Sequence, residues 1–78
     1  MDSRTAFITR VMELCEQENL TLYQLSRISG IPKSTLRSAM HPEQGNPGLK
    51  TITAIAAGFG LSLQEFFDSG LFRDVWDD

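Results

Sequence analysis

The chain has 78 residues, of which 41% are hydrophobic and 22% are charged, and its formal net charge is −3. Such a chain predicts one globular domain with a small core. Its single cysteine excludes an internal disulfide and a metal site built from cysteines. No apolar run reaches the roughly 18 residues of a membrane span, and no secretory signal is visible, so we expect a cytoplasmic protein without membrane contact.

The charges are unevenly placed along the chain. Residues 23–50 hold four Lys or Arg and one acid, whereas residues 1–22 and 51–78 are both acidic. Because salt screens charges that lie more than about 8–10 Å apart, the basic middle can face a polyanion although the whole chain is acidic.

Apolar residues recur at spacings of three and four, which predicts helices rather than a sheet. The first helix is expected over 4–18, and Asn19 suits the left-handed position after its end. We expect Arg10 to pair with Glu13 or Glu16 on the same helix. The apolar stripe of this helix consists of Phe7, Ile8, Val11, Met12, Leu14 and Cys15.

The start of the second helix is strongly marked. Thr21 and Gln24 form a capping box, and Leu20 and Leu25 are placed as a hydrophobic staple. These signals predict a helix over 22–29.

A glycine turn follows. Gly30 can take the positive φ that ends the second helix, and Pro32 is expected at the first position of a third helix, over 32–40. Two short helices joined in this way describe a helix-turn-helix over about residues 22–40.

The remaining elements are a loop, two helices and a tail. The segment HPEQGNPG, residues 41–48, is rich in proline and glycine and predicts the loop. A fourth helix is expected over 49–58 and ends at Gly60, and a capping box in SLQE begins a fifth over 63–68. The stripe of the fourth helix consists of Leu49, Ile52, Ile55, Ala56 and Phe59.

As an ordered set, these features resemble the Cro/CI-type (lambda-repressor-like, XRE) helix-turn-helix family. The resemblance covers about residues 5–68. It implies an all-α fold, namely a compact five-helix DNA-binding domain, with a short apolar C-terminal tail added here and the single domain spanning 1–78. The matching residues are Leu20, Thr21, Leu25, Gly30, Ile31, Ser34, Thr35, Leu36, Asn46, Pro47, Leu49, Ile52, Ile55, Ala56, Gly60, Leu61, Ser62, Leu63, Phe66 and Phe67.

The resemblance also implies that the third helix lies in the major groove of double-stranded DNA and that the second crosses the backbone. Lys and Arg can donate to guanine, and Ser can donate or accept. Leu36 and Ala39 are expected to face inward, and Tyr23 to pack at the surface of the second helix, with a phosphate contact as its alternative. The side chains expected to contact DNA are Lys33, Ser34, Arg37, Ser38, Arg27 and Lys50.

Three positions depart from the family pattern. Leu22 stands where the family usually has a Gln that clamps a phosphate, and Pro32 stands where a Ser or Thr cap is frequent. The loop after the third helix is one residue longer, with His41 and Pro42 in place of Asn-Gly.

The tail is unusually apolar for so small a domain. Phe66 is expected in the core as the staple partner of Leu61. The other large apolar residues are expected to form a dimer interface. They are Phe67, Leu71, Phe72, Val75 and Trp76.

Three classes of function were weighed. The first is a sequence-specific DNA-binding transcriptional regulator acting as a homodimer on a near-palindromic site. The second is a protein-interaction module on the same fold, such as an antitoxin-like protein or an adaptor. An enzyme is not expected, because no nucleophile with a base, paired carboxylates or phosphate loop is visible. We expect no cofactor, metal or small-molecule effector. His41 is expected to be a loop residue. Cys15 is expected to be a core residue rather than a redox switch.

Overall fold

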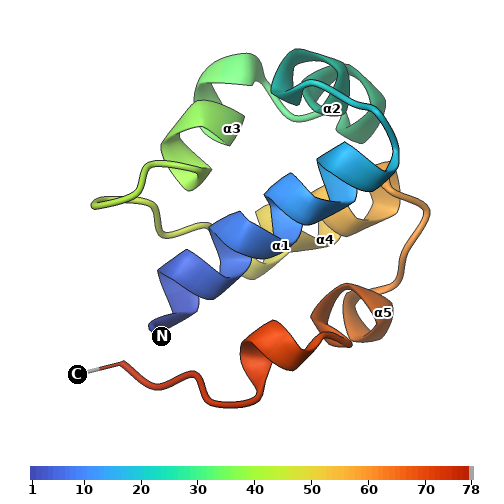
Figure 1. The fold of residues 1–78 in the computed structure, drawn as a ribbon. Coiled ribbons are helices and arrows are strands. Elements are labelled where there is room, and N and C mark those ends of the chain that lie inside the picture. Colours follow the sequence, from blue (N-terminus) through green and yellow to red (C-terminus); the bar gives the residue numbers. More distant parts are fainter. Residues whose placement is uncertain (78) are drawn as a thin grey trace.

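The computed structural model describes residues 1–77, which fold into five α-helices and one 3-10 turn and contain no strand. Figure 1 shows α1 and α4 in the middle of the molecule, with α2 and α3 on one side and α5 with η1 on the other. The predicted all-α, five-helix class is confirmed. The elements are α1 (Ser3–Gln17), α2 (Leu22–Ser29), α3 (Lys33–Ala39), α4 (Leu49–Gly58), α5 (Leu63–Phe67) and η1 (Gly70–Phe72).

Every α-helix contributes a large side chain to one core. No polar or charged side chain is buried within residues 1–77, so the core is held by apolar packing alone. Cys15 belongs to this core, and burial raises the pKa of its thiol, which keeps it protonated and unreactive. The largest fully buried side chains are Val11 of α1, Leu25 of α2, Leu36 of α3, Ile55 of α4 and Phe66 of α5.

The helix boundaries follow local hydrogen-bond chemistry. Both predicted capping boxes are present: Thr21 with Gln24 begins α2, and Ser62 with Glu65 begins α5. Pro32 lies one position earlier than predicted. With ψ at 143° it is the N-cap of α3, and its carbonyl accepts the first helical bond of α3, from the amide of Leu36 at 3.0 Å.

The residues that end helices adopt left-handed backbone where the sequence predicts it. Asn19 after α1 has φ 55°, Gly30 after α2 has φ 74° and Gly60 after α4 has φ 75°. Glycine carries no Cβ and tolerates this conformation without steric cost. These turns reverse the chain and let short helices pack on one another.

Arg10 does not pair with Glu13 or Glu16, and that prediction is wrong. Its Nε donates to the carbonyl of Phe66 at 2.6 Å, and its Nη2 donates to the carbonyl of Glu65 at 3.0 Å. The last carbonyls of a helix have no partner inside the helix, so a guanidinium that reaches them is well placed. Arg10 therefore ties α1 to the end of α5.

Two members of the predicted apolar stripes lie outside the core. Leu49, at the start of α4, is 67% exposed, and Met12 on α1 is 48% exposed. Leu49 is the first residue of α4 and lies outside the core. The buried residues of α4 are Ile55 and Ala56, later in the helix.

The C-terminal tail returns to the first turn of α1. The amide and hydroxyl of Ser3 donate to the carboxylate of Asp77 at 2.9 and 2.6 Å. The next residue, Arg4, donates from Nε to the carbonyl of Gly45 in the α3–α4 loop at 2.7 Å. Both ends of the described chain and this loop therefore meet at one end of α1 (Figure 1).

Candidate nucleic-acid interface

The turn between α2 and α3 is fixed by side chains of α2. The hydroxyl of Ser26 donates to the carbonyl of Ile31 at 2.6 Å, and the amide of Ile31 donates to the hydroxyl of Ser29 at 3.3 Å. The side chain of Ile31 is buried in the core. A Cβ on Gly30 would meet no atom within 4 Å, so glycine is required there for its positive φ rather than for space. The two helices are thus held in one relative orientation.

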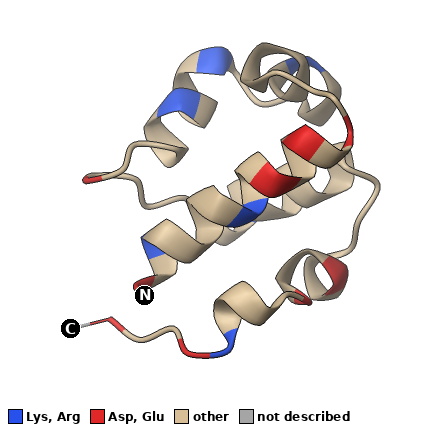
Figure 2. Ribbon diagram, viewed as in Figure 1, with Lys and Arg blue, Asp and Glu red and all other residues tan. Residues whose placement is uncertain are grey.

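Helix α3 has one face in the core and one in solvent. Leu36 and Ala39 are buried, which confirms that they face inward. The exposed face consists only of basic and hydroxyl side chains. Figure 2 shows that α2 and α3 carry basic positions and no acidic ones, whereas the tail after η1 carries both acidic and basic positions. The exposed side chains of α3 are Lys33, Ser34, Thr35, Arg37 and Ser38.

The predicted backbone contacts lie on the neighbouring helices. Arg27 is exposed in the last turn of α2, and Lys50 is exposed in the first turn of α4. Gly48, the N-cap of α4, makes no side-chain capping bond, which leaves the first amides of α4 available to an anion. The first amides of α2 are less available to an anion, because the amide of Gln24 already donates to the hydroxyl of Thr21.

Leu22, at the position where the family usually has a phosphate-clamping Gln, is half-buried against the core. An apolar side chain turned inward cannot clamp a phosphate. Any phosphate contact near the start of α2 must therefore come from another group.

A shallow hollow of about 270 Å³ lies between α3 and the start of α4. Its rim adds polar residues that sequence reasoning missed: Thr35 on α3, Gln44 and Asn46 in the loop, and Thr51 on α4. Of these residues, only Thr35 could have been identified from the sequence, because helical spacing places it on the exposed face of α3. The loop residues line the same hollow as Ser38 only because of the tertiary fold.

The α3–α4 loop has an ordered internal structure. The Nδ1 atom of His41 accepts from the amides of Glu43 and Gln44, both at 3.1 Å, so His41 organises the loop. A Cβ on Gly45 would lie 2.5 Å from the carbonyl oxygen of Ala39. Only glycine fits there, and the loop closes tightly on the end of α3.

Tyr23 lies beside the first residue of α3. The ammonium nitrogen of Lys33 is 5.3 Å from the centre of the Tyr23 ring, which is within the range of a cation–π contact. The tyrosine is 53% exposed. The ring therefore joins the starts of α2 and α3 across the turn.

Within residues 1–77, no group of three or more His, Cys, Asp or Glu side chains could hold a metal ion. None of the helices in that range combines the length and apolar character that crossing a membrane requires.

Comparison with known proteins places this geometry in a family. A family model described as helix-turn-helix matches residues 11–66, which include α2, α3, α4 and the turns between them. No curated protein and no solved structure matches the chain. Since the family match covers well over half of the 78 residues, and residues 1–77 have the expected five-helix fold, the chain belongs to the Cro/CI-type helix-turn-helix family of DNA-binding regulators.

Proposed function

We propose that the chain is a sequence-specific transcriptional regulator that reads the DNA major groove with α3, in the cytoplasm. The observation that carries this proposal is the composition of α3, whose buried face is apolar and whose exposed face has donors and no acid. Lys33 and Arg37 would donate to guanine, and Ser34 and Ser38 would donate to or accept from base edges.

Contacts to the DNA backbone would hold α3 in a fixed position along the major groove. Arg27 and Lys50 lie on α2 and α4, the helices before and after α3 in the chain, and the uncapped start of α4 can bind a phosphate next to Lys50. These contacts are independent of base sequence and are expected to make binding depend on salt.

Selection of bound duplexes from random DNA tests the proposal. The purified chain is expected to enrich one sequence, and log K for that sequence should fall with log salt with a slope of about −2 or steeper if Arg27 and Lys50 each release one counterion. A pool that stays random after selection would overturn the proposal.

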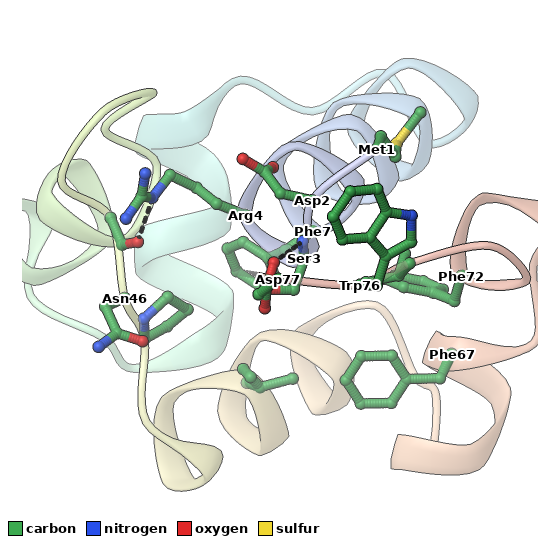
Figure 3. Close-up of a pocket in the computed structure, with 14 residues that line it drawn as sticks. Met1, Asp2, Ser3, Arg4, Phe7, Asn46, Phe67, Phe72, Trp76 and Asp77 are labelled. Carbon is green, nitrogen blue, oxygen red and sulfur yellow. Dashed lines mark hydrogen bonds between the residues drawn. The ribbon is translucent and has the colours of Figure 1, made fainter.

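We further propose that the working unit is a homodimer formed through the tail. One recognition helix reads few base pairs, and two copies spaced by about 34–36 Å lengthen the site by one DNA turn. A groove of about 1020 Å³ lies between the first turn of α1 and the tail (Figure 3). Trp76 stands beside it at 69% exposure, and Phe67 is 38% exposed. The apolar residues that line the groove are Met1, Phe7, Pro47, Ile52, Phe67, Phe72, Val75 and Trp76.

Phe72 belongs both to the proposed interface and to the packing of the domain. Phe72 packs against the core and meets Phe67 edge to face, with ring centres 4.9 Å apart. Leu71 and Val75 are half-buried, which leaves Trp76 as the most exposed apolar anchor for a second copy.

Trp76→Ala is expected to weaken dimerisation at least tenfold, since a buried interface tryptophan commonly contributes about 2 kcal/mol or more. Light scattering over a range of protein concentrations measures the effect. Met12→Ala is the matched control, because Met12 is exposed on α1 and does not line the groove. A parent that stays monomeric at high concentration, or a Trp76→Ala chain that dimerises like the parent, would contradict this interface.

A protein-interaction module on the same fold is the second candidate. The inward-turned Leu22 and the exposed Trp76 favour it, because one removes a phosphate contact and the other offers an apolar anchor. Failure of the DNA selection, together with a dimer that survives Trp76→Ala, would favour this reading.

A further inference from the structure

Lys33 occupies an unfavourable position for a cation. It is the first residue of α3, where the helix dipole presents its positive end. An exposed lysine also samples many rotamers, and fixing one of them costs up to about 2 kcal/mol. A group that holds the ammonium before DNA arrives would reduce both costs.

The ring of Tyr23 meets this requirement. The ammonium lies 5.3 Å from the ring centre, and the negative face of an aromatic ring attracts a cation by about 0.5–1 kcal/mol at exposed sites. Neither α2 nor α3 contains an acid, so no carboxylate on these helices competes for the ammonium.

The position of the Tyr23 ring is well fixed by α2. Tyr23 is the second residue of α2, inside the capping box of Thr21 and Gln24 and two positions before the fully buried Leu25. A tyrosine has only two side-chain torsions, so little freedom remains to its ring. The hydrogen bond from Ser26 to the carbonyl of Ile31 in the turn then fixes the distance between the Tyr23 ring and the start of α3.

We infer that Tyr23 is a positioning residue for DNA recognition: its ring holds the Lys33 ammonium at the tip of α3 in the orientation in which it meets a base. This inference rests on the proposed function of α3. The action of Tyr23 passes through Lys33, and the tyrosine hydroxyl has no part in it.

A double-mutant cycle on the selected DNA site tests the inference. Tyr23→Phe keeps the ring and is expected to bind within twofold of the parent. Tyr23→Leu keeps an apolar side chain but loses the ring, and is expected to bind about 2- to 5-fold more weakly. In a Lys33→Ala background, Tyr23→Leu is expected to have no further effect. Tyr23 and Lys33 are both exposed, so all the variants keep the core intact.

A second readout needs no DNA. The side-chain protons of Lys33 should show an upfield ring-current shift in the NMR spectrum of the free parent and of Tyr23→Phe, and this shift should be absent in Tyr23→Leu. A merely structural role of Tyr23 would not move this signal.

Each contrary result has its own meaning. Equal affinity of parent and Tyr23→Leu, or an effect of Tyr23→Leu that persists in Lys33→Ala, would overturn the inference alone. A Tyr23→Phe chain as weak as Tyr23→Leu would assign the effect to a hydroxyl contact and overturn it too. A parent that binds no DNA would overturn the proposed function with it, even if the ring-current shift is seen.

Discussion

Phe66→Ala is expected to destabilise the fold by about 3–5 kcal/mol. A domain of this length has a total stability of about 4–12 kcal/mol, so the variant should lose from about a quarter to all of it. Phe66 is fully buried and packs against Phe7, Phe67 and Phe72, with ring centres 6.0, 5.1 and 6.3 Å away. The guanidinium of Arg10 lies 5.9 Å from the same ring. Removing the ring leaves a cavity that several elements share.

Urea unfolding, followed by circular dichroism at low protein concentration, measures this loss. Phe67→Ala is the matched control, since Phe67 is the next residue on α5 but is partly exposed. The control is expected to lose clearly less free energy of unfolding than Phe66→Ala. The reverse order would show that the core does not centre on Phe66.

The second large effect concerns DNA. Replacing both Lys33 and Arg37 by Ala should weaken binding to the selected site by at least about 30-fold, since each good base contact contributes about 1–3 kcal/mol. Both side chains are exposed, so the melting temperature should stay close to that of the parent. Fluorescence anisotropy with a labelled duplex, beside a thermal melt, separates recognition from folding.

Arg73→Ala provides the control for a general loss of positive charge, because Arg73 is exposed and directly follows η1, which lies across α1 and α4 from α3 (Figure 1). It is expected to bind the site nearly as well as the parent. If the Lys33/Arg37 variant binds as tightly as the parent, α3 is not the element that reads DNA.

The parts of the fold that were predictable depend on chemistry within a few residues. The capping boxes of Thr21 and Ser62 and the left-handed Gly30 are confirmed because their hydrogen bonds and backbone conformation are set locally. The inward faces of Leu36 and Ala39 follow from helical spacing alone. The exposed face of α3 was predictable for the same reason.

The contacts that sequence reasoning missed join distant segments. Arg10 bonds to a carbonyl 56 positions away, Ser3 to Asp77 at 74 and Arg4 to Gly45 at 41. Local spacing places a glutamate one turn away from Arg10 on α1, whereas the carbonyls of Glu65 and Phe66 come within its reach only once α1 and α5 have packed. The hollow beside Ser38 and the ring against Lys33 depend on tertiary structure in the same way.

The carboxylates that accept hydrogen bonds from Thr5, Ser62 and Ser3 make the fold sensitive to acid at one end. These bonds hold the pKa values of Asp2, Glu65 and Asp77 below their ordinary range. A carboxyl group with a lowered pKa in the folded state stabilises the fold above its ordinary pKa, and this contribution is lost as the pH falls through the lowered value. The free energy of unfolding should therefore stay level near neutrality and decline below about pH 4.

Urea unfolding at several pH values measures that decline, and Asp77→Asn should make it shallower, whereas Asp74→Asn should not. Equal slopes in the two variants would contradict the role of Asp77. Two of the three carboxylates lie where the tail meets the first turn of α1, and none lies on α2 or α3. Acid below about pH 4 should thus release the tail from α1, and with it the proposed dimer contact, while the recognition helix stays folded.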